Sequence, residues 1–187
     1  LVHPALALSC PSAVTRDPAL DTLAHALESL WNRHANPISD RFAVQAARRV
    51  IANLADVLDR PQDLAVRTQL SLAALEAGLA FSQTRTALAH ALSYDVTLSL
   101  GVSHGLACAI WLPTAWRLAQ GCDRQVDDRL AEVFGCGAAD GAGLLVEWLQ
   151  GVGVDASPLA YGITDADARI LDALNSPRGR NFIGSSA

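Results

Sequence analysis

The sequence contains neither lysine nor methionine, and all 14 of its basic residues are arginines. A P-loop needs a lysine to bind nucleotide phosphates, and a Schiff-base enzyme needs one to bond its substrate. The missing lysine therefore excludes both classes. The net charge of -5 and the scattered positions of the arginines also argue against a nucleic-acid partner.

Cysteine pairs of the C-x-x-C type are absent, although the chain has four cysteines. Cys10, Cys108, Cys122 and Cys136 lie in alanine- and leucine-rich surroundings, which favours buried free thiols in a reducing compartment over disulfides or a zinc finger. The longest strongly apolar run, residues 105–116, is shorter than the ~20 residues that a membrane helix needs. With no signal peptide visible, we expect a cytoplasmic protein without a membrane partner.

The length of 187 residues, 51% of them apolar and 18% charged, is sufficient for one domain with a hydrophobic core. The chain starts with Leu1-Val2-His3-Pro4 and has no initiator methionine. We interpret it as a piece of a longer polypeptide.

Beyond Pro18, apolar residues recur at helical spacing, and alternation with a period of two is hard to find. The pattern predicts an all-α fold, a helical bundle of about seven to eight helices. Asp17 and Pro18 would open the first helix, and Ser39 or Asp40 the second. The expected helices cover about residues 18–35, 39–59, 62–82, 86–98, 105–119, 124–134, 139–151 and 165–174, and residues 176–187 are expected to form a loop.

Three positions on these helices carry specific expectations. Gly78, late in the third helix, predicts a neighbouring helix or a ligand too close for a side chain. Phe81 and Trp111 are expected to pack in the core.

One acidic residue and three histidines form a candidate metal site. Asp21 and His25 are four residues apart on a predicted helix, so their side chains leave the same face. His90 lies on another predicted helix, and His104 follows the break at Gly101. Such a donor set suits Fe²⁺ or Zn²⁺ and leaves room for a substrate oxygen. The spacing alone is also compatible with a helix cap and with hydrogen-bonded core histidines.

Six short segments have distinctive sequences: residues 21–28 (DTLAHALE), 36–40 (NPISD), 77–82 (AGLAFS), 90–94 (HALSY), 104–107 (HGLA) and 112–113 (LP). Their order and gaps resemble the helical C-terminal domain of the iron-containing (group III) alcohol dehydrogenases. The resemblance implies that Asp21, His25, His90 and His104 are the four ligands of Fe²⁺ or Zn²⁺. It also implies reversible hydride transfer between NAD or NADP and an alcohol or aldehyde.

The resemblance further implies a domain organisation. Residues 1–15 would be a lead-in segment from an N-terminal nucleotide-binding domain that precedes Leu1, and residues 16–187 would form the all-helical metal-binding catalytic domain. The chain would then be the C-terminal half of a two-domain dehydrogenase and inactive alone, because NAD or NADP would bind mainly to the other domain. Members of this family are often oligomers, so a homo-oligomer is expected.

The chain departs from the family pattern at Tyr94, where many members have a second histidine that relays a proton. A phenol can relay a proton, although it is a weaker acid than imidazolium. Arg85, five residues before His90, is a candidate substrate-binding residue, and Arg178 and Arg180 in the tail are expected near it or in solvent. Guanidinium groups there would suit an anionic aldehyde such as phosphonoacetaldehyde, which some similar family members reduce.

Two other classes remain open at this point. The chain could be a non-catalytic helical bundle that binds a metal or a protein partner. It could also be a metallohydrolase, in which the ion activates water. A hydrolase needs a general base near the ion, and Glu28 is the only local candidate.

Overall fold

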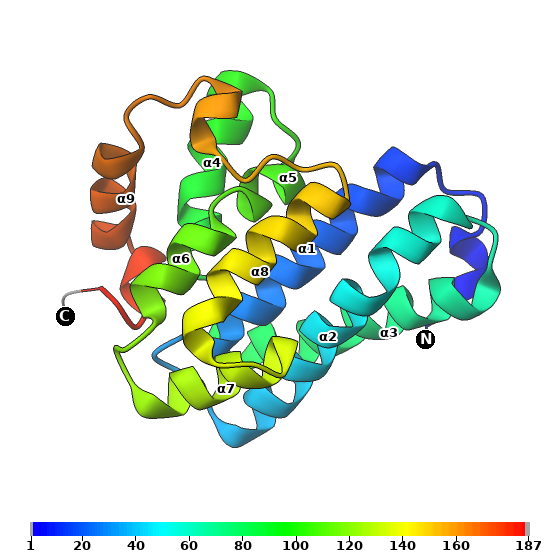
Figure 1. The fold of residues 1–187 in the computed structure, drawn as a ribbon, viewed down its shortest axis with the longest axis horizontal. Helices are drawn as coiled ribbons and strands as arrows, with labels where there is room; N and C mark the ends of the chain where they lie inside the picture. Colours follow the sequence, from blue (N-terminus) through cyan, green and yellow to red (C-terminus); the bar gives the residue numbers. More distant parts are fainter. Residues whose placement is uncertain (1, 186–187) are drawn as a thin grey trace.

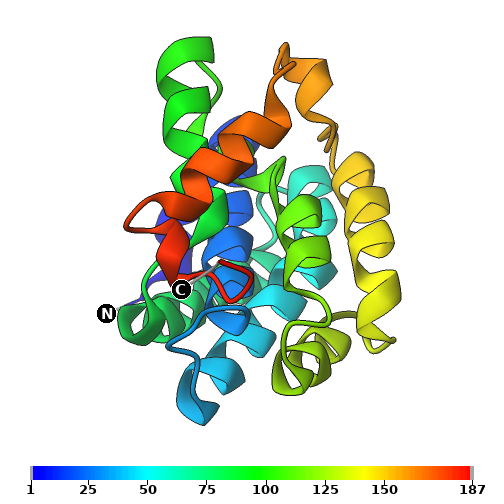
Figure 2. The same ribbon diagram turned by 90° about the vertical axis from the view of Figure 1, so that its left-hand side faces the viewer.

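The computed structural model describes residues 2–185 and confirms the all-α prediction (Figures 1 and 2). Within those residues the only β-type pairing is one isolated bridge between Asn32 and Phe182. The α-helices are α1 (Ser12–Leu30), α2 (Pro37–Asp59), α3 (Leu64–Thr84), α4 (Leu88–Leu100), α5 (His104–Ala109), α6 (Leu112–Ala119), α7 (Arg124–Phe134), α8 (Ala138–Gly151) and α9 (Ala166–Asn175). Three short 3₁₀ helices complete the fold: η1 (Pro4–Ala7), η2 (Pro158–Tyr161) and η3 (Gly179–Asn181).

Helix α1 begins at Ser12 rather than at Pro18, so the prediction that Asp17 and Pro18 open it is wrong. The cause is a long-range contact. The buried Arg67 guanidinium donates to the Thr15 hydroxyl at 2.6 Å and to the carbonyl of Cys10 at 2.9 Å, and these bonds fix the segment that precedes Pro18. Before it, residues 4–7 form a 3₁₀ turn.

Helix α2 also begins earlier than predicted. Its N-cap is Asn36, whose side chain accepts hydrogen bonds from the backbone N–H groups of Ile38 and Ser39. The Ser39 hydroxyl in turn accepts from the Asn36 N–H at 2.9 Å, which completes a capping box. Pro37 fits the first helical position because it needs no hydrogen-bond partner there. Ser39 therefore helps to cap the helix from within its first turn.

The segment predicted as one helix over 105–119 is two helices. Pro113 has no N–H group with which to bond the carbonyl of Ala109, so the first helix ends there and α6 starts with Pro113 in its first turn. Helix α4 ends at Gly101, which adopts a left-handed conformation with φ 68°. The short α5 is thus free to point its first residue, His104, back toward α1.

Helix α1 occupies the centre of the domain and packs against α2, α3 and α5 (Figure 1). Trp31, at its end, is fully buried with Trp116 and Phe182, whose rings meet it edge to face. Trp111 is also fully buried, as predicted. Phe182 belongs to the tail, which returns beside α4 and α9 (Figure 2). The tail is therefore part of the core, and residues 186–187 of the predicted loop lie outside the described residues.

Two glycines behave in opposite ways. A side chain at Gly78 would meet nothing within 4 Å, so the predicted close approach there is wrong. A Cβ at Gly105 would lie 1.9 Å from the carbonyl oxygen of Asp17. Gly105 therefore allows α5 to pack directly on α1.

The four cysteines are free, as predicted. Only Cys108 is buried, whereas Cys10 and Cys136 are half-buried and Cys122 is exposed. The expectation of burial is wrong for Cys122, since the turn after α6 places it at the surface.

Helix α3 is long and apolar enough to cross a membrane by length and composition, with 21 residues and a mean hydropathy of 1.2. Within the described residues it packs along α2 and α1. Two of its charged residues bond to other parts of the domain: Arg67 to the N-terminal segment and Glu76 to Arg49 at 2.9 Å. We therefore interpret α3 as a helix of this domain.

Candidate metal centre

Three helices bring Asp21, His90 and His104 together, and His25 lies against the second carboxylate oxygen of Asp21. Asp21 and His25 lie one turn apart on α1, His90 lies in the first turn of α4, and His104 is the first residue of α5. The two oxygens of Asp21 face different histidines. Oδ2 is 3.4 Å from Nε2 of His25, and Oδ1 is 3.3 Å from Nε2 of His90 and 3.5 Å from Nε2 of His104.

These distances suit a shared cation. A tetrahedral ion with bonds of about 2.0 Å separates its ligand atoms by about 3.3 Å. Oδ1 of Asp21 and Nε2 of His90 are both buried and have no hydrogen-bond partner within the described part of the chain. Buried polar atoms without a partner are costly, and a cation between them would remove that cost. The residues present therefore fit a divalent metal ion.

Cys108 is a donor that the sequence analysis missed. It lies one turn after His104 on α5, and its Sγ is 3.8 Å from Nε2 of His104. Asp21, His90, His104 and Cys108 offer ligand atoms that all lie within 4.8 Å of one another. The i, i+4 spacing of His104 and Cys108, the same as that of Asp21 and His25, was the available signal.

Glu28 is fully buried behind His90. Its carboxylate accepts hydrogen bonds from the backbone N–H groups of Ala87, Ala89 and His90 at 2.7, 2.5 and 3.2 Å, and lies 2.7 Å from Nδ1 of His90. It thus caps α4, whose own N-cap residue, Ala87, provides no side-chain bond. With its oxygens occupied in this way, Glu28 is not available as the general base that a hydrolase would need.

The electrostatics of the site follow from this crowding. Burial disfavours a charged His90, but its contacts with Asp21, Cys108 and Glu28 outweigh burial and raise the pKa of His90 to about 12. Burial would also raise the pKa of Asp21, yet His25 and His90 hold it well below its usual range. Contact with Cys108 raises the pKa of His104. Burial alone would raise the pKa of the Cys108 thiol, but His104 and His90 lower it. The Asp21 carboxylate and the Cys108 thiol thus favour a positive charge among the histidines of the site.

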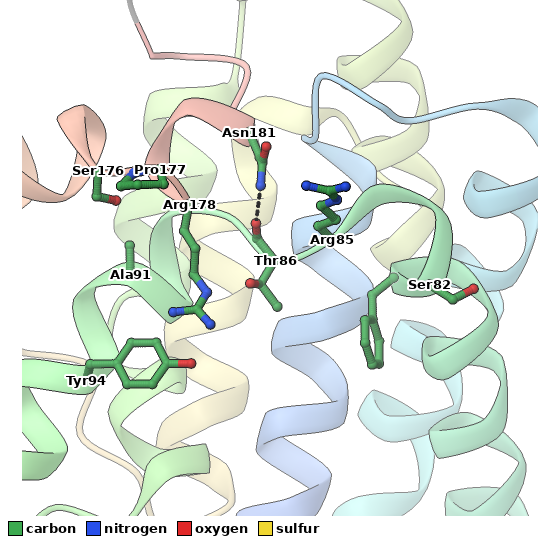
Figure 3. Close-up of a pocket in the computed structure, with 10 residues that line it drawn as sticks. Ser82, Arg85, Thr86, Ala91, Tyr94, Ser176, Pro177, Arg178 and Asn181 are labelled. Carbon is green, nitrogen blue, oxygen red and sulfur yellow. Dashed lines mark hydrogen bonds between the residues drawn. The ribbon is translucent and has the colours of Figure 1, made fainter.

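Phe81 lies at the edge of the site and not in the core, so the prediction for this residue is wrong. Its ring stacks on His25 with centroids 4.2 Å apart and an interplanar angle of 19°. Phe81 also lines a pocket of about 730 Å³. This pocket lies between the end of α3, α4 and the tail (Figure 3). The pocket therefore adjoins the metal-binding side chains.

Tyr94 and two arginines also line this pocket. The Tyr94 ring lies 6.0 Å from the His104 ring, centroid to centroid, and Arg178 places its guanidinium carbon 4.6 Å from the centre of the Tyr94 ring (Figure 3). Arg85 borders the same space, whereas Arg180 is not among the lining residues. The structure thus brings Arg85 and Arg178 to one pocket and leaves Arg180 outside it.

Comparison with known proteins identifies relatives of this chain. The profile of the Fe-containing alcohol dehydrogenase family, C-terminal, matches residues 15–171. The 1,3-propanediol dehydrogenase of Klebsiella pneumoniae is 33% identical over 110 residues, which are 59% of this chain and 28% of the relative. The 1-propanol dehydrogenase PduQ of Salmonella typhimurium is 32% identical over 137 residues, 72% of this chain and 37% of the relative.

Among solved structures, sulfoacetaldehyde reductase from Bifidobacterium kashiwanohense in complex with NAD⁺ is similar over 96% of this chain and 48% of its own, with a TM-score of 0.86 and 25% identity. The chain spans less than half the length of each of these three relatives. The extent of the profile match and the helical fold lead to one conclusion: the chain belongs to the iron-containing alcohol dehydrogenase family and corresponds to its C-terminal domain.

Proposed function

We propose that this chain is the metal-binding part of an enzyme that interconverts an alcohol and an aldehyde with NAD or NADP. The observation that carries the proposal is the convergence of Asp21, His25, His90 and His104 beside a pocket large enough for a small substrate. The named activities of the relatives, which include two alcohol dehydrogenases and an aldehyde reductase, support it.

In this proposal the four side chains hold Fe²⁺ or Zn²⁺. When bound, the ion would supply a Lewis acid for the substrate oxygen, and the nicotinamide would supply or accept the hydride. The protein orients the ligands beforehand. Glu28 accepts a hydrogen bond from the protonated Nδ1 of His90 at 2.7 Å. Nε2 of His90 is then directed toward Asp21 and available to the ion.

Tyr94 is the proposed proton relay. The residue is 41% exposed and lines the pocket, and its ring lies near that of His104. A hydroxyl in this position can pass a proton between the substrate oxygen and water. No histidine occupies the position, so the phenol is the group available for this step.

The remaining parts of the proposal concern the whole protein. An N-terminal nucleotide-binding domain, joined through residues 1–15, would supply the site for NAD or NADP, and the helical domain would cover residues 16–187. The relative solved with NAD⁺ supports a nicotinamide nucleotide. We further propose a cytoplasmic homo-oligomer, in keeping with the free cysteines.

Metal binding by the chain tests the proposal directly. Purified chain should bind one equivalent of Fe²⁺ or Zn²⁺, measured by elemental analysis after removal of free metal. His90→Ala should abolish this binding because it removes a buried ligand, whereas His34→Ala, at an exposed position, should not. Equal metal content in the two variants would refute the ligand assignment.

The activity is tested on the protein that extends this chain at its N-terminal side. Sequencing upstream of the Leu1 codon should reveal a nucleotide-binding domain, and the product should oxidise NADH or NADPH when an aldehyde is added. A chelator should stop the reaction, and added metal should restore it. A hydrolase without nucleotide-dependent turnover would contradict the proposal.

A further inference from the structure

The pocket beside the metal-binding side chains is positively charged, although the chain as a whole has a net charge of -5. Its lining includes two arginines and no aspartate or glutamate. Figure 3 shows the two arginines on different elements of the pocket lining, Arg85 at the end of α3 with its guanidinium beside Asn181, and Arg178 in the tail with its guanidinium beside Tyr94. Two like charges are therefore placed around one space without a neutralising carboxylate in its lining.

Arg85 has an unusual backbone. Its φ of 68° is the only positive value for a non-glycine residue in the described part of the chain. Such a conformation costs free energy and tends to occur where function requires it. Three hydrogen bonds fix it: the Arg85 N–H donates to the carbonyl of Phe81 at 2.7 Å, and its carbonyl accepts from the Asn32 side chain at 3.2 Å and from the Thr84 hydroxyl at 3.3 Å.

These hydrogen bonds involve only the backbone of Arg85, so its side chain is free to bind other groups. Its guanidinium has no hydrogen bond or ion pair within the described residues, and the side chain is exposed. Within those residues, seven of the other thirteen arginines have such partners; Arg49 and Arg67 are examples. Arg85 thus combines a fixed, costly backbone with five unused donors.

Arg178 is fixed from the other side of the pocket. The Asn181 side chain, three residues later, donates to the carbonyl of Thr86 at 2.9 Å, which ties the tail to the segment that follows Arg85 (Figure 3). Arg178 stacks on Tyr94, and this cation–π contact leaves the edge of the guanidinium free to donate. It has no carboxylate partner within residues 2–185.

We propose that Arg85 and Arg178 together bind the acid group of the substrate, so that the enzyme acts on small aldehydes and alcohols that carry a phosphonate, sulfonate or carboxylate. This inference rests on the proposed function. Guanidinium groups bind such oxygens in pairs, and two of them in the lining of one pocket suit an anion with several oxygens. The carbonyl end of the same molecule would face the metal-binding side chains across Tyr94 and Phe81.

The similarity to sulfoacetaldehyde reductase supports this substrate class, because that relative acts on an aldehyde with a sulfonate group. The phosphates of the nicotinamide nucleotide are also anionic groups that the two arginines could bind. The experiment must therefore separate an acid group on the substrate from one on the nucleotide.

Steady-state kinetics of the metal-loaded enzyme separate them. For Arg85→Ala and Arg178→Ala, we expect KM for phosphonoacetaldehyde or sulfoacetaldehyde to rise about ten-fold or more relative to KM for propanal, since each loses a charge-assisted hydrogen bond. Arg180→Ala, a tail arginine outside the pocket, should leave both values unchanged. Equal changes for anionic and neutral aldehydes would overturn the proposal. An increase confined to KM for NADH or NADPH would also overturn it and assign the arginines to the nucleotide.

A binding measurement keeps the test independent of turnover. Calorimetry with the metal-loaded chain and 2-hydroxyethanesulfonate, an anionic alcohol, should show binding that both variants weaken and Arg180→Ala does not. 1-Propanol should bind more weakly than this alcohol. If the enzyme lacks dehydrogenase activity, the proposed function fails, while this measurement still decides the anion site. Absence of binding, or binding that both variants retain, would refute the anion site.

Discussion

The carboxylate of Glu28 and the ring of His90 meet at 2.7 Å in the fully buried layer behind the candidate metal centre. One residue therefore links the cap of α4 to the orientation of a proposed ligand. A carboxylate in this position fixes the tautomer of a ligating histidine and raises its basicity. The metal centre thus depends on a residue that does not itself face the ion.

Replacement of Glu28 by glutamine should weaken metal binding by roughly 10- to 100-fold, because a neutral amide cannot equally favour a proton on Nδ1 of His90. Competition with a chromophoric chelator measures the affinity. Glu147→Gln, at an exposed position of α8, is the matched control. An affinity equal to that of the control would show that Glu28 acts only as a helix cap.

Gly105→Ala should destabilise the domain by about 1–3 kcal/mol, because the new methyl group would overlap the carbonyl of Asp17 and force α5 away from α1. His104 would move with α5, so metal affinity should fall as well. Gly78→Ala is the control: its methyl group meets open space, and alanine is favoured over glycine within a helix by about 1 kcal/mol. Urea unfolding of the two variants should shift in opposite directions, and a loss of stability in both would contradict this account.

Tyr94→Phe should lower kcat by roughly 10- to 100-fold and leave KM nearly unchanged, because it removes the hydroxyl that relays the proton but keeps the ring under Arg178. Kinetics of the metal-loaded enzyme test this separation. Tyr161→Phe, which removes a phenol hydroxyl in η2 away from the pocket, is the control and should leave kcat unchanged. A change in KM without a change in kcat would assign Tyr94 to substrate binding instead.

Asp40 should give the stability of the domain a measurable pH dependence. Burial raises its pKa above the ordinary 3.8, with Glu132 adding to the effect and Arg129, at 2.8 Å, opposing it. A raised folded-state pKa means that the folded chain takes up the proton more readily than the unfolded chain, so stability increases as the pH falls toward 3.8 and is lost as the pH rises through the folded-state value.

The comparison with Asp40→Asn isolates this effect. The wild-type free energy of unfolding should rise relative to that of the variant as the pH is lowered from about 7 to about 4. Urea titrations at several pH values measure the difference. A difference between wild type and Asp40→Asn that stays constant over this pH range would disprove the prediction.

Local sequence patterns predicted most helices because their apolar residues repeat at the helical period, and α7 has the predicted limits. Some helix limits were predicted wrongly because contacts with residues distant in the sequence determine them. Arg67 extends α1 toward the N-terminus through Thr15 and Cys10, which no window around Pro18 could reveal. Pro113 divides the predicted helix over 105–119 into α5 and α6. This division could have been predicted, because the proline is visible within the apolar run.

For the metal centre, spacing placed Asp21 and His25 on one face of a helix, but it could not bring α4 and α5 to that face. That convergence depends on tertiary contacts such as the one at Gly105, and only the family resemblance implied it beforehand. Glu28 and Phe81 were assigned other roles in the sequence analysis, because neither a buried cap nor a ring stacked on His25 leaves a local signal.

Asp21, His25 and Glu28 share one helix, and their separations equal about one helical turn each. A single inserted or deleted residue between them would rotate the later positions by about 100° and direct them into the surrounding leucines. Related sequences should therefore tolerate changes of length in the loops around the pocket but none within this stretch of α1. Gaps in this stretch would mark relatives that have lost the metal centre.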